Sequence, residues 1–250
     1  MIHNTPDLSI IVPCFNEPDN MKILVQQFQK LLAHSCYTIE IIIIDGGSTD
    51  QTPKRLKELF KTLDPSHFKL HLMTSRNGYG HDIMTALSHA KGNVLAWTHA
   101  DLQTDPNDVI KAYELYRNRT SEKTILKGRR KNRQLTEALF TFGMQLVSWA
   151  LLGTYLKDIN AQPKLFSRAF YESILKKDAP SDFSLDLFLL YQAKKNNYAI
   201  HEIPVLFKKR QFGEAKGGSG SSLKTKLNLI KRTLAYIIKL SKHNKSHIIT

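Results

Sequence analysis

Three apolar runs in the first half of the chain each end in a turn rich in acidic and polar residues. The runs are Leu8–Val12, Ile39–Ile44 and Val94–Trp97. Apolar runs of strand length alternate here with helical patterns, and this alternation predicts βαβ units and a mainly parallel sheet. In such a sheet the carboxyl ends of the strands lie at one edge, where ligands bind. We therefore expect the three turns to meet around a single pocket.

The remaining periodic segments predict an α/β fold that continues into the second half of the chain. Helical patterns occur at Met21–Ala33, Pro53–Phe60, Asp82–Ala90 and Pro106–Tyr116. Further strands are expected at Lys69–Met73, Thr124–Leu126, Lys164–Phe166 and Ala199–Val205, with helices from Ser167 and over Ser184–Asn196. Ile41–Ile44 is apolar at every position, which is typical of a central strand buried on both faces.

The chain is strongly basic, and this limits its partners to classes that carry negative charge. Its 250 residues include 36 lysines and arginines against 22 aspartates and glutamates, a net charge of +14. Such a surplus attracts nucleic acid, anionic lipid or sugar nucleotides. The sequence has no RNA-binding sheet signature, and acidic turns would repel a phosphate backbone, so we expect no nucleic-acid partner.

Cysteine usage and the first residues predict a reducing compartment. The two cysteines, Cys14 and Cys36, have no zinc-ligand spacing and are too few for a disulfide framework. Both are expected to be buried, as free cysteines often are. The first residues show neither a basic region nor an apolar stretch of signal-peptide length. We therefore expect a cytoplasmic location.

The acidic turns carry three motifs in a characteristic order. They are Pro-Cys-Phe-Asn-Glu ending at Glu17, Asp-Gly-Gly-Ser-Thr-Asp starting at Asp45, and His-Ala-Asp-Leu-Gln starting at His99. Order and spacing resemble the front half of family 2 glycosyltransferases of the GT-A fold. Within that family the chain is most similar to dolichol-phosphate mannose synthases and related polyprenyl-phosphate sugar transferases.

The resemblance implies a GT-A fold, a Rossmann-like, mixed but mainly parallel α/β sheet flanked by helices. It also implies the residues that hold the nucleotide sugar: Pro13, Asn16, Glu17, Asp45, Gly78, Gly80, His99 and Ala100. Glycines allow close approach of a backbone to the donor diphosphate, and a following helix offers free N–H groups. The chain departs from the family at the position expected to contact the nucleobase of the donor, because the family motif usually has a second aspartate where this chain has Gly46.

The third motif implies a divalent metal site. The family pattern is aspartate-any-aspartate, and the polyprenyl-phosphate branch reads Asp-Ala-Asp-Leu-Gln where this chain has His99 first. The implied ligands are Asp101, Gln103 and His99, with Asp101 also catalytic. Magnesium prefers oxygen ligands, whereas imidazole would favour manganese, so Mg²⁺ or Mn²⁺ is expected. His99 could equally fill the place of aspartate without binding metal.

Acceptor recognition is the least determined part of the resemblance. Arg129, Arg130, Arg210 and Lys216 lie where related enzymes bind an acceptor phosphate, which arginine can grip with a planar fork. A phosphate acceptor is already ionised and needs no strong base. A hydroxyl acceptor would need one, and Asp186 matches the region where such a catalytic base lies.

Two segments predict contact with a membrane surface. We divide the chain into a GT-A domain at 1–216, with an interfacial helix about 134–156, and a tail at 217–250. Ala138–Leu156 carries no charge, but its polar residues make it a marginal span, so an interfacial or core-docked helix is the alternative. After a Gly/Ser hinge the tail continues as a basic amphipathic helix, which either binds a membrane surface or packs on the domain.

Together these features predict an inverting, metal-dependent glycosyltransferase that moves a hexose from a nucleotide sugar to a polyprenyl phosphate. One alternative keeps the fold and donor but glycosylates a saccharide of an envelope polysaccharide or lipopolysaccharide. Another is a catalytically inactive GT-A binding subunit. The expected partners are a nucleotide-sugar donor, a lipid-linked phosphate or saccharide acceptor and an anionic membrane surface at its cytoplasmic face, with a membrane protein as an open alternative.

Overall fold

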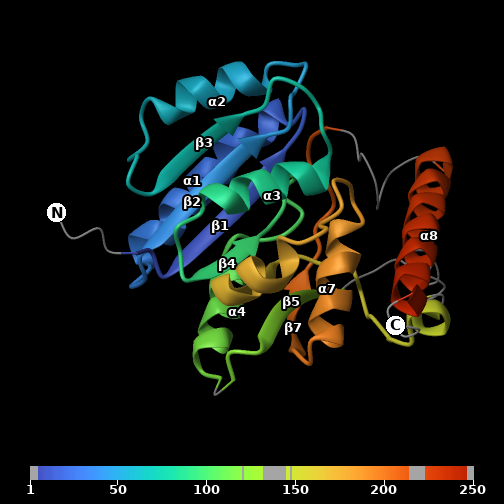
Figure 1. The fold of residues 1–250 in the computed structure, drawn as a ribbon. Coiled ribbons are helices and arrows are strands. Elements are labelled where there is room, and N and C mark those ends of the chain that lie inside the picture. Colours follow the sequence, from blue (N-terminus) through green and yellow to red (C-terminus); the bar gives the residue numbers. More distant parts are fainter. Residues whose placement is uncertain (1–4, 120, 132–144, 147, 214–222, 247–250) are drawn as a thin grey trace.

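The computed structural model describes residues 5–119, 121–131, 145–146, 148–213 and 223–246 (Figure 1). Its centre is a seven-stranded sheet with the order β3-β2-β1-β4-β6-β5-β7. The strands are β1 Leu8–Cys14, β2 Ile39–Asp45, β3 Phe68–Leu72, β4 Val94–Trp97, β5 Thr124–Lys131, β6 Lys164–Ser167 and β7 Ala199–Leu206. The helices are α1 Pro18–His34, α2 Thr52–Phe60, α3 Tyr79–His89, α4 Asn107–Arg117, α6 Arg168–Phe170, α7 Leu185–Lys195 and α8 Leu223–Ser246, with a π-helical turn, η1, at Tyr171–Leu175.

Strand direction places the functional turns at one edge of the sheet. β1 pairs in parallel with β2 and β4, β2 pairs in parallel with β3, and β5 pairs in parallel with β7. Only β6, among these strands, runs the other way, antiparallel to both β4 and β5. The carboxyl ends of β1, β2, β4 and β7 therefore share one edge. The predicted mixed, mainly parallel α/β fold is confirmed.

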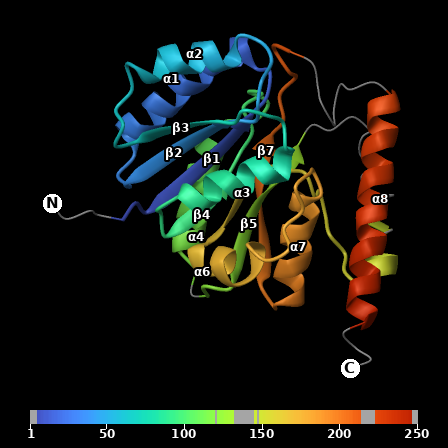
Figure 2. The same cartoon turned by 45° about the horizontal axis from the view of Figure 1, so that its top comes forward.

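The sheet is buried on both faces by separate apolar clusters. In β2, Ile41 and Ile43 belong to the cluster formed with α1, α2 and α4, whereas Ile42 and Ile44 belong to the cluster formed with α3 and α7. Figures 1 and 2 show these helices on the two sides of the sheet. Because consecutive strand residues point to opposite faces, an unbroken run of isoleucine covers both. Each such side chain contributes about 1.5–3 kcal/mol through burial.

Two expectations about the second half of the sheet and the cysteines need correction. The strand expected at Thr124–Leu126 continues to Lys131, because the basic residues pair along the whole length of β7. Lys127 is buried there and its Nζ lies 3.1 Å from Glu202 Oε1, so β7 supplies the charge that a buried lysine needs. Cys14 is buried as expected, but Cys36 is exposed at the turn after α1.

The two predicted membrane-facing segments are described only in part. Of the segment 134–156, residues 145–146 and 148–152 are helical, and this short helix lies beside α8 (Figures 1 and 2). In α8, Ile237 is fully buried in the cluster that includes α7, whereas Leu227 and Ile238 are exposed. No helix among the described residues is both long and apolar enough to cross a membrane. The predicted boundary at 216/217 and the hinge fall in 214–222, outside the described residues.

Candidate functional site

A pocket opens at the sheet edge where the turns after β1, β4 and β7 meet. Predicted residues line it from three places: Pro13 at the end of β1 and Glu17 after it, His99, Ala100 and Asp101 after β4, and Arg210 after β7. The other lining residues are Cys14, Phe15, Arg76, Tyr79, Asp82 and Phe183. The turns after β1 and β4 converge around one cavity as the sequence predicts, whereas the turn after β2, which was expected to join them, contributes no residue to its lining.

Hydrogen bonds from the turn after β2 hold the turn after β1 in place. Asp45 is 1% exposed and accepts hydrogen bonds from the backbone N–H and the hydroxyl of Ser48. Ser48 Oγ in turn accepts from the Asn16 N–H at 2.7 Å. The N–H of Glu17 is bonded to Thr52 Oγ1 at 2.9 Å. Asn16 and Asp45 do not line the pocket, so the structure shows them holding the turns in place, and their predicted donor contacts stay predictions.

The turn after β4 brings His99 and Asp101 together. His99 Nδ1 lies 3.9 Å from Asp101 Oδ2, and both side chains are only partly exposed. Asp101 Oδ1 accepts a hydrogen bond from the N–H of Gln103 at 3.1 Å, which fixes the carboxylate in the turn. The Gln103 side chain instead donates to the carbonyl of Lys208 at 3.1 Å and does not line the pocket.

Arg210 spans the pocket between the first and third motifs. One of its Nη atoms pairs with Glu17 Oε1, and the other lies 3.8 Å from Asp101 Oδ2. Its Nε donates to the carbonyl of Phe212 at 2.8 Å, so the guanidinium is held on three sides. A cation thus already occupies the space between two carboxylates from turns that are far apart in the sequence. An anionic ligand at this place would compete with the two carboxylates for the guanidinium of Arg210.

Tyr79 connects the pocket to a buried polar network on β6 and α7. Its hydroxyl lies 3.2 Å from His99 Nε2 and donates to Asp186 Oδ2 at 3.3 Å. Asp186 is 2% exposed and pairs with the fully buried Lys164, with 3.0 Å between Nζ and Oδ1. Gln162 also donates to Asp186, at 3.0 Å.

The charges of this network are balanced internally. Burial and the neighbouring charge of Asp186 raise the pKa of Tyr79 well above its ordinary range, so its hydroxyl keeps its proton. Burial lowers the pKa of Lys164, and the Asp186 carboxylate opposes that shift. Asp186 therefore lies behind Tyr79 in an ion pair, outside the pocket lining, and its predicted role as a base stays a prediction.

The glycines of the loop before α3 have a different neighbour from the one expected. A Cβ on Gly78, which has φ +112°, would overlap the carbonyl oxygen of Ser181, and one on Gly80 would overlap that of Pro180. The close backbone approach that these glycines permit is thus to the loop before α7. Two side chains of this region reach the pocket: Arg76, and Tyr79, which is stacked on Phe183 with 4.7 Å between the ring centroids.

Arg129 and Arg130, the other described residues predicted to bind phosphate, do not line this pocket. Arg130 donates to Asp158 Oδ1 from Nε at 2.9 Å, and its guanidinium forms a tight ion pair there. Arg129 Nε lies 3.7 Å from Glu202 Oε2 and the side chain is 59% exposed. Lys216 is outside the described residues. Of the four residues predicted for this role, Arg210 is the one that the structure places at the pocket.

Arg76, Tyr79, Asp82 and Phe183 were not among the predicted site residues. Arg76 follows β3 and lies over the Phe15 ring, 3.9 Å from its centroid. Two of them could have been found from their place in the sequence, because Arg76 and Tyr79 flank Asn77-Gly78 in the loop that the family resemblance assigns to the donor. No local pattern marks Phe183 or Asp82, whose places depend on packing between segments distant in sequence.

The comparison with protein families agrees with this geometry. The family model "Glycosyl transferase family 2" matches residues 9–184, which is well over half of the chain. The chain belongs to this family. The sequence-based prediction of a family 2 glycosyltransferase is thereby confirmed, and the matched range includes all three acidic turns.

Curated relatives of the chain act on a lipid-linked phosphate. The chain is 26% identical over 214 residues to the undecaprenyl-phosphate 4-deoxy-4-formamido-L-arabinose transferase of Pseudomonas fluorescens, covering 84% of the chain and 59% of that protein. The enzyme of the same name from Klebsiella pneumoniae is also 26% identical, with 84% and 62% covered. The chain thus spans about three fifths of the length of these relatives. The predicted relationship to polyprenyl-phosphate sugar transferases is confirmed.

Solved structures share the fold at low sequence identity. Glucosyl-3-phosphoglycerate synthase of Mycobacterium tuberculosis, in complex with Mn²⁺, UDP and glucosyl-3-phosphoglycerate, aligns with a TM-score of 0.70 at 17% identity, covering 94% of this chain and 80% of that one. A mannosyltransferase of Pyrobaculum calidifontis, in complex with GDP-mannose and Mn²⁺, aligns with a TM-score of 0.58 at 20% identity, covering 82% and 57%. These likenesses confirm the GT-A fold.

Proposed function

We propose that this chain is an inverting, metal-dependent hexosyltransferase that uses a nucleotide sugar and glycosylates a polyprenyl phosphate at the cytoplasmic face of a membrane. The observation that supports it most is the convergence of Glu17, Asp101, His99 and Arg210 on one pocket at the carboxyl ends of β1, β4 and β7. The undecaprenyl-phosphate transferases to which the chain is similar support the lipid acceptor. Structural neighbours that hold UDP or GDP-mannose with Mn²⁺ support the donor and the metal.

The residues at the pocket fit a divalent cation that is completed by its substrate. Within the described part of the chain, no three His, Cys, Asp or Glu side chains come together as a ready-made metal site. Asp101 and His99 nevertheless face each other across 3.9 Å and offer one oxygen and one nitrogen. A cation that keeps open positions for diphosphate oxygens needs few protein ligands, and a nitrogen ligand favours Mn²⁺. When bound, it would act as a Lewis acid on the leaving diphosphate.

The chain's own residues prepare the pocket for an anionic donor. Arg210 lies between Glu17 and Asp101 in this structure, so its positive charge lowers the repulsion between the two carboxylates. On donor binding the guanidinium would exchange these carboxylates for phosphate oxygens, which it can grip in the same bidentate way. Tyr79, held between Asp186 and His99, keeps the imidazole turned toward Asp101.

The buried state of Asp186 supports a phosphate acceptor over a saccharide hydroxyl. A general base must reach the proton that it removes. Asp186 faces Lys164 and Gln162 and lies behind Tyr79, so it is poorly placed for that task. A phosphate monoester is ionised near neutral pH and attacks without such a base. Its charge is matched by the basic surplus of the chain.

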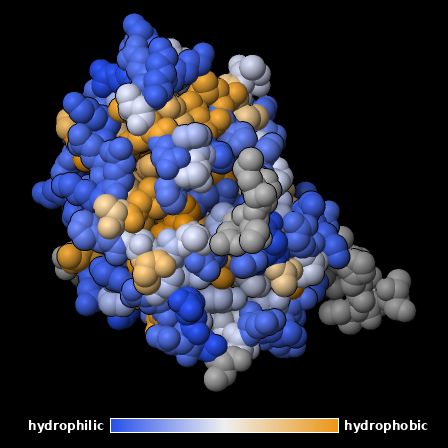
Figure 3. All heavy atoms as spheres, turned by 90° about the vertical axis from the view of Figure 1, so that its left-hand side faces the viewer, coloured by the Kyte–Doolittle hydropathy of each residue, from blue (hydrophilic) through white to orange (hydrophobic). Residues whose placement is uncertain are grey.

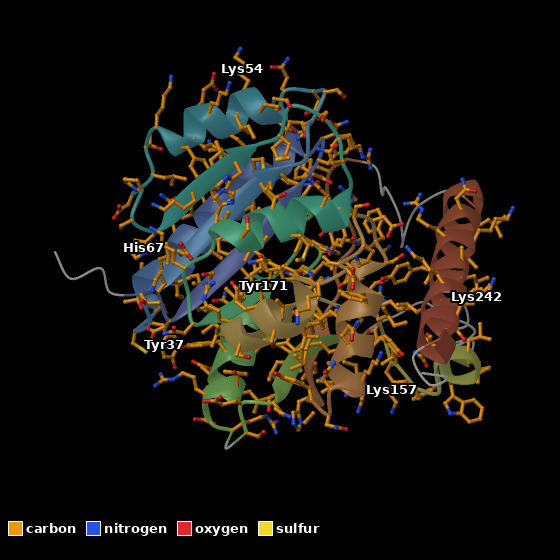
Figure 4. All side chains as sticks on the ribbon, viewed as in Figure 1. Tyr37, Lys54, His67, Lys157, Tyr171 and Lys242 are labelled. Atoms are coloured by element: carbon orange, nitrogen blue, oxygen red, sulfur yellow. The ribbon has the colours of Figure 1, made fainter. Side chains whose placement is uncertain are left out.

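The membrane contact is proposed for the side of the molecule that carries α8. Exposed apolar side chains gather on α8 and on the short helix beside it; they are Leu146, Trp149, Leu151, Leu227 and Ile238. Lys242 projects from α8, and Lys157 lies on the same side of the molecule (Figure 4). Apolar and basic residues together are typical of a helix that lies in the membrane interface. The opposite face of the molecule is mostly hydrophilic, with an apolar band showing between the charged residues (Figure 3).

The proposed function is tested by sugar transfer from nucleotide hexoses to undecaprenyl phosphate in the presence of Mn²⁺, for wild type and Asp101→Ala. We expect the variant to lose at least a hundredfold in rate, because it lacks the one carboxylate at the metal. Asp105→Ala, which removes a carboxylate from the same turn but outside the pocket, is the control and should keep its rate. Equal rates for wild type and Asp101→Ala would refute the metal site, and no transfer from any donor would refute the function.

A further inference from the structure

Asp82 occupies the space in which a side chain at position 46 would lie. A Cβ built on Gly46 would overlap Asp82 Oδ2 and lie 3.1 Å from Asp82 Cγ, whereas its next neighbour, the Cys14 carbonyl oxygen, is at an ordinary 3.5 Å. Gly46 does not have a positive φ, so its backbone would accept any residue. The glycine is thus needed for one reason, which is to make room for the carboxylate that α3 delivers.

The carboxylate of Asp82 is buried at the pocket and lacks a hydrogen-bond partner for one of its oxygens. Asp82 is 5% exposed and lines the pocket, and its Oδ1 makes no hydrogen bond, with His81 Nδ1 lying 3.7 Å away. A buried polar atom without a partner destabilises the fold, so such an atom usually serves a ligand or a water. Asp45, by contrast, has both oxygens engaged by Ser48 and does not line the pocket.

Asp82 contacts Gly46 at the end of β2, whereas the proposed metal ligands follow β4, on the other side of β1 in the sheet. Burial raises the pKa of this aspartate's carboxyl group, the charge of Arg76 lowers it and that of Asp45 raises it, and Gly46 is in contact with the carboxylate. The pocket also carries Phe15 with Arg76 stacked over its ring at 3.9 Å, a flat surface of the kind on which a nucleobase stacks. The diphosphate belongs beside Asp101 and Arg210. A donor that places its diphosphate there extends its base toward Asp82.

We propose that Asp82, rather than Asp45, presents the carboxylate that accepts the ring N–H of the donor's base, so that the chain selects uridine or guanosine diphosphate sugars. Uracil carries this donor at N3 and guanine at N1, whereas cytosine and adenine have no ring N–H on their pairing edge. A hydrogen bond to an ionised carboxylate is stronger than one to a neutral acceptor. The inference rests on the proposed function, because it assigns the base to the pocket proposed for the nucleotide sugar.

The first test measures binding of UDP, GDP, CDP and ADP with Mn²⁺ by calorimetry, for wild type, Asp82→Ala and Asp82→Asn. We expect Asp82→Ala to lose roughly 10- to 100-fold in affinity for the diphosphate that wild type prefers, UDP or GDP, and less than threefold for CDP and ADP. Asp82→Asn keeps the shape and a neutral acceptor, so an intermediate loss is expected. Asp108→Asn is the control, because Asp108 is a buried carboxylate in the first turn of α4, as Asp82 is in α3.

A swap of the carboxylate between α3 and the turn after β2 separates this role from a structural one. Gly46→Asp alone should weaken binding or folding, because its side chain would overlap Asp82. In Gly46→Asp combined with Asp82→Ala that overlap is gone, and the new carboxylate enters the same space. We expect this double variant to regain at least tenfold in affinity over Asp82→Ala for the preferred diphosphate.

The outcomes distinguish this inference from the proposed function. Undiminished binding of UDP and GDP by Asp82→Ala and Asp82→Asn would overturn the role of Asp82 and leave the function standing. An equal loss for all four nucleotides would also overturn it, because the residue would then shape the pocket without reading the base. Failure of the wild type to bind any nucleoside diphosphate would overturn both.

Discussion

At the scale of single residues, the raised pKa of Asp82 in the pocket makes the stability of the fold depend on pH. Burial raises the pKa of its carboxyl group from the ordinary value of 3.8 to about 6, against the opposing influence of His81 and Arg76. The folded state therefore keeps a proton that the unfolded chain releases between these two values. Stability is then greatest below about pH 4, falls as the pH rises to about 6, and changes no further above it through this group.

We expect the pH dependence of stability to differ between wild type and Asp82→Asn. The asparagine does not titrate, so the free energy of unfolding of wild type relative to the variant should fall by about 1–2 kcal/mol between pH 4 and pH 6.5. Urea unfolding across this range measures the difference. Asp108→Asn, whose carboxylate pairs with Lys111 at 2.8 Å, is the control and should give no fall of this kind. A pH-independent difference for Asp82→Asn would contradict the raised pKa.

At the scale of elements, the buried pair between β6 and α7 joins the sheet to the helical layer beneath the pocket. Lys164 Nζ lies 3.0 Å from Asp186 Oδ1 and 2.6 Å from the carbonyl of Ala161. Removal of one partner leaves a buried charge uncompensated, so Lys164→Met should destabilise the fold by about 3–5 kcal/mol. The double variant Lys164→Met with Asp186→Asn should lose no more than Lys164→Met alone, so the loss measured for Asp186→Asn alone in urea unfolding gives the coupling between the two residues.

The double variant also tests the class of acceptor. If the acceptor is a phosphate, loss of the Asp186 carboxylate leaves the transfer rate within about tenfold of Lys164→Met. If Asp186 is the base for a hydroxyl acceptor, the rate falls by about 10²–10⁴-fold more. Additive unfolding energies for the two substitutions would show that the pair is not coupled and would remove the basis of both expectations.

The elements differ in how far their sequence determines them. β2 and the turn at Asp45 were predictable because an all-apolar run and an acidic turn are local patterns. The extension of β5 to Lys131 was not, because a basic run becomes a strand only beside β7 with its Glu202. Asp82 was missed for the same kind of reason, since its contact with Gly46 joins α3 to the end of β2. Local periodicity carries no information on such pairings.

At the scale of the whole molecule, α8 lies along one side of the domain and is held there by apolar and charged contacts (Figure 1). Ile237 ties the helix to the cluster around α7, and Arg232 Nε lies 3.8 Å from Asp182 Oδ2 in the loop that also contacts Gly78 and Gly80. Packing on the domain, one of the two possibilities that the sequence left open for this helix, is thus seen for one face of it, and membrane binding stays a prediction for the other. One face packs on the domain, and the other, with Leu227 and Ile238, is exposed.

The exposed face of α8 predicts binding to anionic membranes. We expect the full chain to sediment with vesicles that contain anionic lipid, and salt to weaken this binding because charges contribute to it. Leu227→Asp combined with Ile238→Asp should lower the partition coefficient at least tenfold. Lys54→Glu changes the net charge by the same amount on exposed α2, far from α8 (Figure 4), and should lower it far less. Equal losses in the two variants would show that net charge alone drives binding and that α8 has no special part in it.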